Sequence, residues 1–388
     1  MTSLDRASAA DAPLGRDGAG RGALAAWLAV LAIAAFAYRD AWTTMVSIWS
    51  ESDKYQHGFA ILPMAAWAAW EQRGRLAGLP PAPSWRGVVA VAACAAAWAL
   101  GMLAGVNAAM LLAAVGIVGA ATWAVLGGRI ARAMAFPLLF LLFMVPLGES
   151  LAAPLMSLTA DVLEVALRVT GVPVLREDFE FTLPTGRWSV IEACGGLNYL
   201  VAALPLAAFC AHREFSRNAS RLAFVALAVA VALVANWFRA YLVVMIGHLS
   251  GMRWGVGFDH LVYGWVLFGV VMGGVFWLGR VLGDGGSVTA LHLEPGAVRS
   301  APTPTRTGTL ARTAAVATLA VASVVAALVL GGATARVAPR PDFAAVLGGA
   351  LGGTPARPEP APVFTGHRDA LARRVDEAAG LDAFVAYY

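Results

Sequence analysis

Cys194 stands directly before a strongly apolar run, in the sequence Glu-Ala-Cys-Gly-Gly-Leu of residues 192–197. If that run is a helix, its unpaired amides and the positive end of its dipole stabilise a thiolate at this position. Cysteine is also a common small filler where a loop meets a helix, so the position alone leaves nucleophile and packing residue both open. Cys94 and Cys210 lack this setting, and packing is the favoured explanation for both.

Arg239 interrupts another apolar run, in the sequence Asn-Trp-Phe-Arg of residues 236–239. An arginine within the bilayer costs at least about 2.5–3.5 kcal/mol on insertion scales, so we expect it to face a partner or a wet cavity. Asn236 lies three residues earlier on the same helical face, and the two side chains could donate hydrogen bonds to an oxyanion or to Cys194. An arginine that only reaches the outer interface is the alternative.

His260 follows Asp259 at the start of a later apolar run. Imidazole titrates near neutral pH, so His260 could take the thiol proton as a general base and return it to a leaving amine. Asp259 could orient the ring or cap the helix. Taken singly, His260 is more often an interface histidine than a catalytic one.

Two further polar residues are weaker candidates. His57, in the sequence Tyr-Gln-His-Gly of residues 55–58, could contact a substrate or serve as an interfacial anchor. Glu192 could pair with Arg239 or Arg187, or stay a solvated loop carboxylate. The remaining histidines show no metal-ligand spacing, so we expect neither a metal nor an organic cofactor.

The composition predicts an integral membrane protein. Of 388 residues, 59% are hydrophobic and 13% are charged, and the mean hydropathy is +0.70, which is too apolar for a soluble domain. Nearly all positive charge is arginine in short loops between apolar runs, a pattern that sets membrane topology and does not indicate nucleic-acid binding. The three cysteines form no CxxC pair, which makes a disulfide framework or a zinc cage improbable.

Nine apolar runs are predicted to cross the bilayer. They cover residues 23–41, 57–71, 86–104, 108–127, 130–148, 196–212, 219–247, 260–280 and 311–331. Arginines concentrate before the first run and in alternate loops, which places the N-terminus in the cytoplasm and Cys194 on the outer face. We therefore expect an all-α multi-pass bundle with about eight core spans and one C-terminal span. Its topology brings Cys194, Arg239 and His260 to one face of the membrane.

The outer connection before Cys194 has a pattern of its own. Residues 154–169 place apolar side chains at helical spacing between charges, which predicts an amphipathic helix on the membrane surface. Residues 179–183 and 187–191 alternate on either side of a Pro-Thr-Gly turn. A small periplasmic hairpin is therefore expected to lead the chain to Cys194.

Composition divides the chain into five regions. Residues 1–22 are predicted to be a disordered cytoplasmic tail, 23–282 the transmembrane catalytic domain, 283–310 a cytoplasmic linker, 311–331 an additional span and 332–388 a periplasmic tail. The tail ends in residues that resemble a strand, so we expect it to be an incomplete domain.

Four sequence blocks together resemble the exosortases, transpeptidase-like membrane enzymes of Gram-negative bacteria that are related to the archaeosortases. The blocks are residues 192–197, residues 236–239, His260 with Gly264, and residues 55–59 with Pro63. The resemblance covers residues 25–282. The family often has serine after the cysteine, where this chain has Gly195, and this difference does not affect the nucleophile. The C-terminal tail is similar to the start of a periplasmic domain that accompanies some exosortases.

The resemblance implies a Cys194-Arg239-His260 site in the bacterial inner membrane, facing the periplasm. The implied substrates are membrane-anchored proteins with a C-terminal Pro-Glu-Pro motif, a single membrane helix and a basic cluster. Cleavage near the motif would pass the acyl group to an acceptor in envelope or exopolysaccharide export. Supporting roles fall to Asn236, His57, Glu192 and Asp259.

Two other functions remain open at this stage. A non-catalytic membrane subunit of an exopolysaccharide export system would use Arg239 as a structural or headgroup-binding charge. A membrane cysteine acyltransferase would use the same residues to move lipid chains.

Overall fold

The computed structural model describes residues 14–253, 258–284, 306–337, 354–355, 369–376 and 381–387. It divides into two compact units, residues 1–328 and 329–388, and the division falls within the last helix. The first unit contains every candidate site residue named above.

The N-terminal part of this unit consists of helices around an apolar core. The helices are α1 (Leu14–Ala37), α2 (Arg39–Glu51), α3 (Gly58–Glu71), α4 (Arg73–Ala77), α5 (Trp85–Ala104), α6 (Asn107–Ala121), α7 (Gly128–Ala133) and α8 (Ala135–Phe140). A π-helical turn (Thr122–Leu126) follows α6, and a 3-10 turn (Leu141–Met144) follows α8. Apolar side chains from α1, α2, α5, α6 and α13 (Arg306–Val337) form one cluster, in which Met45, Val91 and Ala320 are fully buried.

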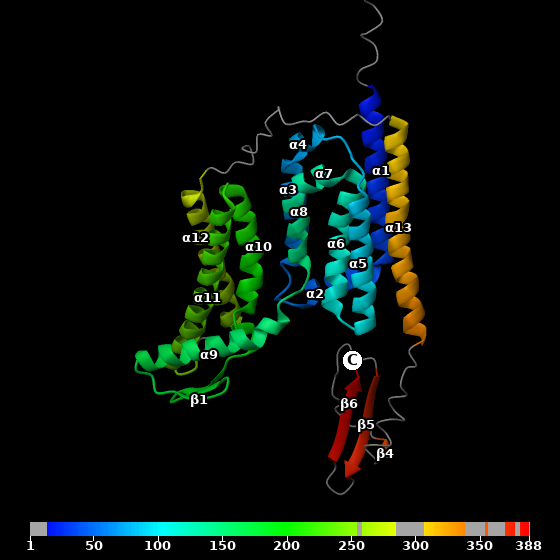
Figure 1. The fold of residues 1–388 in the computed structure, drawn as a ribbon. Helices are drawn as coiled ribbons and strands as arrows, with labels where there is room; N and C mark the ends of the chain where they lie inside the picture. The colour runs from blue at the N-terminus through cyan, green and yellow to red at the C-terminus, as the bar shows by residue number, and fades with distance from the viewer. Residues whose placement is uncertain are drawn as a thin grey trace, which may run out of the picture. The chain divides into compact units, whose positions relative to one another are not determined.

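The part that carries the candidate site contains α9 (Ala152–Val169), α10 (Leu197–Glu214), α11 (Asn218–Leu249) and α12 (Phe258–Leu282). Helices α10 to α12 run side by side, and α9 crosses them near one end (Figure 1). Small residues allow α10 and α11 to approach closely, because Ala203, Ala207, Ala228 and Ala232 are all fully buried.

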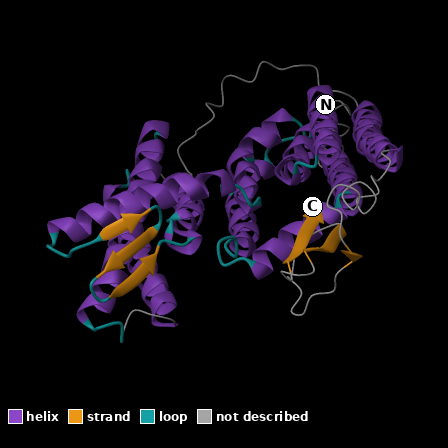
Figure 2. Ribbon diagram, turned by 90° about the horizontal axis from the view of Figure 1, so that it is seen from below, coloured by secondary structure: helices purple, strands orange, loops and turns teal. Residues whose placement is uncertain are grey.

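A three-stranded antiparallel sheet follows α9, with β1 (Leu175–Glu177), β2 (Glu180–Leu183) and β3 (Gly186–Ser189) in that order. Alternation along β2 buries Phe181 and Leu183 and exposes their neighbours. The buried residues pack with α9 and with Val244 of α11, so the sheet lies against these helices (Figure 2). The predicted hairpin is confirmed as β2 and β3, and β1 is an addition that the sequence pattern did not indicate.

The structure confirms an all-α multi-pass membrane protein. Six helices of the described residues are long and apolar enough to cross a bilayer, and two shorter apolar helices cover Ala135–Met144 and Val266–Leu282. The six segments are Gly20–Ala37, Trp85–Ala104, Asn107–Leu126, Glu149–Val169, Asn218–Leu249 and Ala311–Val329. Because α9 runs across α11, it would lie along the surface of a bilayer that α11 crosses, as its amphipathic pattern predicts.

One predicted span differs from the structure. Residues 130–148 do not form one helix, because Met134 separates α7 from α8 and the 3-10 turn at Leu141–Met144 ends the helical path. The predicted run 57–71 agrees with α3 to within one residue. With 14 residues at 1.5 Å per residue, α3 is about 21 Å long, shorter than a hydrocarbon core of about 30 Å, as the length of the run already indicated.

Helices α1 and α13 extend beyond the boundaries predicted for the neighbouring regions. Residues 14–22 belong to α1, so this part of the expected disordered tail is helical, and α1 ends at Ala37 before the charged Arg39-Asp40 pair begins α2. Helix α13 includes residues 306–310, which were expected in the linker, and residues 332–337, which were expected in the tail. Residues 1–13 and 285–305 lie outside the described residues.

The second unit contains an antiparallel sheet with the order β4 (Thr354–Pro355), β5 (Asp369–Asp376) and β6 (Leu381–Tyr387). Residues Asp369 and Tyr387 are paired in its register. The strand expected near the end of the chain is thus confirmed as β6.

The sheet beside the candidate site depends on Gly247 of α11. A Cβ atom on Gly247 would lie 2.2 Å from Cζ2 of Trp188 in β3. We expect Gly247→Ala to displace the indole and to destabilise sheet packing by about 1–3 kcal/mol, the usual cost of overpacking. Limited proteolysis of residues 170–193 in detergent should become faster.

The matched control is Gly274→Ala in α12, where nothing lies within 4 Å of the added Cβ. Equal proteolysis of the two variants would contradict the packing role of Gly247.

Candidate active site

Cys194 ends a 3-10 turn (Glu192–Cys194) that leads through two glycines into α10. Gly196 adopts a left-handed conformation, with φ at 97°, and a Cβ there would lie 2.9 Å from Nδ2 of Asn236. Glycine is therefore required at this position, both for its backbone conformation and for space. The result is that Cys194 lies beside the N-terminus of α10, as the sequence predicts.

Two buried side chains hold the main chain of this turn. Asn236 Nδ2 donates to the carbonyl oxygen of Cys194 at 2.9 Å, and Thr159 Oγ1 of α9 donates to the carbonyl oxygen of Gly195 at 3.0 Å. Both side chains are almost fully buried. In this structure Asn236 Nδ2 therefore holds the backbone of Cys194, whereas the sequence suggested an oxyanion or the thiol as its acceptor. Thr159 was missed, although a threonine among the apolar residues of α9 was a visible signal.

Arg239 lies one helical turn beyond Asn236 and is only 7% exposed. Its guanidinium donates a hydrogen bond to the Cys194 thiol, and Cζ lies 5.8 Å from the ring centre of Tyr199 in α10. Tyr199 OH in turn donates to the carbonyl oxygen of Gly264 in α12 at 2.8 Å. The arginine thus occupies the space where α10, α11 and α12 meet at the cysteine.

Gly264 leaves room for this arginine. A Cβ atom on Gly264 would lie 2.9 Å from Nε of Arg239 and 3.4 Å from Cζ. The conformation of α12 at this position is ordinary, so the requirement for glycine here comes from the close approach of the guanidinium.

Burial has the largest influence on the Cys194 thiol and raises its pKa above the ordinary value. The positive charge of Arg239, the Ile191 backbone and the hydrogen bond from Arg239 lower the pKa, but only partly offset burial. The thiol is therefore protonated at neutral pH in this conformation. Nucleophilic attack from this state requires a base to remove the proton.

His260 and Asp259 lie in the first turn of α12. The structure describes their backbone but not their side chains. His260 precedes Gly264 by four residues, and residues with this spacing share a helical face. Its role as the base stays a prediction.

Lys54, in the turn before α3, binds Glu192 next to the cysteine. Its Nζ donates to both carboxylate oxygens of Glu149 at 3.0 Å and to Oε1 of Glu192. Tyr55 OH also donates to Oε1 of Glu149, at 3.0 Å. The sequence suggested Arg239 or Arg187 as the partner of Glu192, and this suggestion was wrong because the ion partner is Lys54. Lys54 is the only lysine of the chain, a signal that could have drawn attention to it.

His57 lies in the same turn as Lys54 and directly precedes α3. Its Nδ1 is 3.2 Å from the carbonyl oxygen of Lys54, and its ring centre is 6.3 Å from that of Tyr55. These contacts place His57 beside Lys54, which binds Glu192, and beside Tyr55, which binds Glu149. A contact with substrate stays a prediction.

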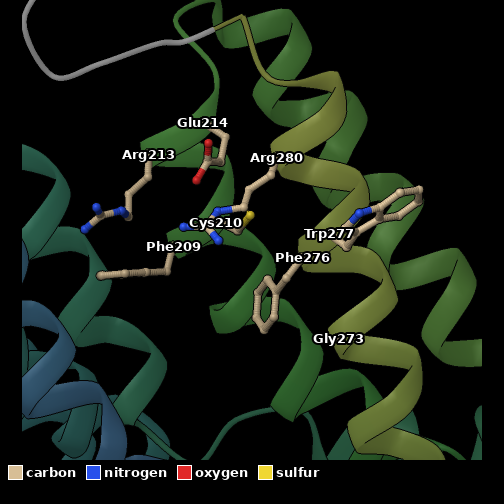
Figure 3. Close-up of a pocket in the computed structure, with 8 residues that line it drawn as sticks. All are labelled: Phe209, Cys210, Arg213, Glu214, Gly273, Phe276, Trp277 and Arg280. Atoms are coloured by element: carbon tan, nitrogen blue, oxygen red, sulfur yellow. The ribbon is translucent and has the colours of Figure 1, made fainter.

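A cavity of about 390 Å³ lies between α10 and α12 away from this site (Figure 3). It is lined by Phe209, Cys210, Arg213, Glu214, Gly273, Phe276, Trp277 and Arg280. Cys210 lies 13 residues after Leu197, the first residue of α10, and so about 20 Å along the helix from its start beside Cys194. The cavity is therefore separate from the candidate nucleophile.

The contact between Arg239 and Cys194 predicts how thiol reactivity depends on pH. In a Cys94→Ala, Cys210→Ala background, alkylation of Cys194 should show its inflection above the ordinary cysteine pKa. Arg239→Gln removes two influences that lower this pKa, so the inflection should move to still higher pH. Alkylation at pH 7 should slow accordingly, because the thiolate fraction falls about tenfold when the pKa rises by one. Rates measured from pH 7 to about 11.5 provide the test.

Arg168→Gln is a suitable control, because Arg168 pairs with Glu164 on α9 and is largely exposed. An unchanged inflection in the Arg239→Gln protein would contradict the contact.

The space beside Gly264 predicts a second effect on the same thiol. Gly264→Ala should push the Arg239 guanidinium away from Cys194 and slow its alkylation at pH 7. Gly269→Ala in the same helix has nothing within 4 Å of its new Cβ and should leave the rate unchanged. If both variants react like the parent protein, Gly264 does not set the position of Arg239.

Comparison with known proteins supports one family. No curated protein and no solved structure matches the chain significantly. The family model described as transmembrane exosortase (Exosortase_EpsH) matches residues 49–277, which include Lys54, Cys194, Arg239 and His260. This match covers more than half of the chain, from the helix before Lys54 into α12, so the chain belongs to the transmembrane exosortase family.

Proposed function

We propose that this protein is a membrane cysteine protease or transpeptidase that cleaves C-terminal sorting signals of the Pro-Glu-Pro type. The observation that carries the proposal is the buried contact between the Cys194 thiol and the Arg239 guanidinium at the N-terminus of α10. Membership of the exosortase family supports the same reaction class.

The first step of the proposed reaction forms a thioester. His260 removes the proton from Cys194, and the sulfur attacks the carbonyl carbon of the scissile peptide. Arg239 and the positive end of α10 stabilise the tetrahedral oxyanion. Collapse of this intermediate breaks the C–N bond, and His260 returns the proton to the departing amine.

The second step releases the acyl group from Cys194. Water or an amine attacks the thioester carbonyl carbon while His260 takes a proton from the attacking group. The C–S bond then breaks, which gives a carboxylic acid from water or a new amide from an amine, and His260 returns the proton to the sulfur of Cys194. Throughout both steps, the hydrogen bonds from Asn236 and Thr159 keep the turn with Cys194 in place.

The proposed substrate is an exported protein that is held in the bacterial inner membrane by one helix. Its sorting motif would reach Cys194 at the periplasmic face, while its helix remains in the bilayer beside the apolar surfaces of the enzyme. Exposed apolar residues such as Phe238 and Val266 on α11 and α12 are compatible with lipid or with such a helix.

Replacement of the nucleophile tests the proposal. In cells that contain a membrane-anchored protein with a Pro-Glu-Pro signal, Cys194→Ala should leave the precursor uncleaved, because no thioester can form. Immunoblotting follows the precursor, and mass spectrometry of the product distinguishes a cut peptide from a transferred lipid chain. Membrane fractionation checks that the variant is inserted.

Cys210→Ala is the matched control, since Cys210 lies in α10, the helix that follows Cys194, but near its other end and far from the site. Normal cleavage by the Cys194→Ala protein would reject the nucleophile.

A further inference from the structure

The turn that carries Cys194 is held from three sides. Asn236 of α11 binds the Cys194 carbonyl oxygen, and Thr159 of α9 binds the Gly195 carbonyl oxygen. The third contact reaches the Glu192 side chain from Lys54, which lies between α2 and α3. Lys54 thus connects the nucleophile's turn to a part of the bundle far away in sequence.

The hydrogen-bonding capacity of Lys54 is completely used. A lysine ammonium has three donors on one nitrogen, and Nζ has three carboxylate oxygens as acceptors, two from Glu149 and one from Glu192. The Lys54 side chain is only 12% exposed, whereas those of Glu149 and Glu192 are 62% and 52% exposed. The lysine is the ordered centre of the cluster, and the carboxylates approach it from the solvent side.

Neighbouring groups keep this centre charged and in place. Burial lowers the pKa of Lys54, but its contacts with Glu192 and Glu149 more than compensate, so the pKa lies above the ordinary value. Tyr55 OH donates to Glu149 at 3.0 Å and fixes that carboxylate. A loss of the ammonium would leave two carboxylates close together, and their repulsion would move Glu192 with its turn.

We propose that Lys54 is a positioning residue for Cys194. It holds the turn Glu192–Cys194 so that the thiol stays against Arg239, and it acts through Glu192 without touching the substrate. The inference rests on the proposed function, because it assumes that Cys194 is the nucleophile. A compact ammonium suits this role better than the planar guanidinium used at the 27 arginine positions of the chain.

A purely stabilising ion pair is the alternative explanation. Pairs with exposed carboxylates contribute little to stability, and their loss would lower the amount of folded protein without changing the chemistry of the folded fraction. If Lys54 positions the thiol, then Arg239→Gln should slow alkylation of Cys194 less when Lys54 is replaced. This difference between the two backgrounds can be measured.

The test is a double-mutant cycle in the Cys94→Ala, Cys210→Ala background. In the parent protein, Arg239→Gln should slow alkylation of Cys194 at pH 7. In Lys54→Met protein the thiol no longer lies against Arg239, so Arg239→Gln should have at least about threefold less effect on the rate, a typical size for contacting residues. Precursor cleavage by Lys54→Met should fall about tenfold in kcat, since small displacements of reacting groups cost this much or more.

Arg176→Met is the matched control. Arg176 also binds two carboxylates, Asp161 at 2.7 Å and Glu164 at 3.1 Å, and its side chain is 19% exposed, but it joins β1 to α9. The Arg239→Gln effect and precursor cleavage should both be unchanged in this background.

A second measurement needs no substitution that could impair folding. Because Lys54 is the only lysine, an amine-acetylating reagent has two target amines, Lys54 and the N-terminus. The Lys54 side chain is only 12% exposed and is bound to carboxylates, so the reaction is run at alkaline pH until mass spectrometry shows acetylated Lys54. Acetylation removes the charge and should reduce precursor cleavage as Lys54→Met does. Lys54→Arg protein keeps a cation at this position, should retain more activity than Lys54→Met, and should be insensitive to the reagent.

The inference is overturned if Lys54→Met or acetylated protein cleaves precursor at the parent rate, or if Arg239→Gln has its full effect in the Lys54→Met background. Failure of the proposed function gives a different result, because Cys194→Ala would then process precursor normally. The alkylation cycle would still report whether Lys54 positions the thiol.

Discussion

The buried charge of Arg239 is the constraint on which this part of the protein depends. A guanidinium inside an apolar bundle is stable only where polar and aromatic partners surround it. The structure supplies the Cys194 thiol, the face of Tyr199 and the room left by Gly264. Three helices must meet around one side chain, and small buried alanines on α10 and α11 permit this approach. Stability of the bundle and reactivity of the thiol therefore depend on the same contact.

Two opposing influences act on that thiol. Burial favours the neutral sulfur, whereas Arg239 favours the thiolate, and burial has the larger effect in this conformation. A cysteine of this kind is unreactive at rest and depends on a base for its activation. In the proposed reaction, this base is His260.

Much of the architecture was predictable from local patterns. Long apolar runs predicted α5, α6, α11 and α13, and alternation around a Pro-Thr-Gly turn predicted β2 and β3. The pattern failed at residues 130–148, where a run that is apolar apart from Arg132 and two prolines breaks between α7 and α8. Composition reports whether a segment prefers lipid, but the path of its backbone depends on neighbouring helices.

The sequence by itself determined the residue types of the site and their order: a cysteine before an apolar helix and an arginine three residues after an asparagine. These follow from local chemistry and from the cost of charge in an apolar run. Only the tertiary structure decided the partners, because Lys54, Glu149 and Glu192 lie far apart in the chain and are brought together by the helices between them. Asn236 could have reached a thiol or a carbonyl oxygen, and the packing of α11 against the turn at Cys194 selected the carbonyl.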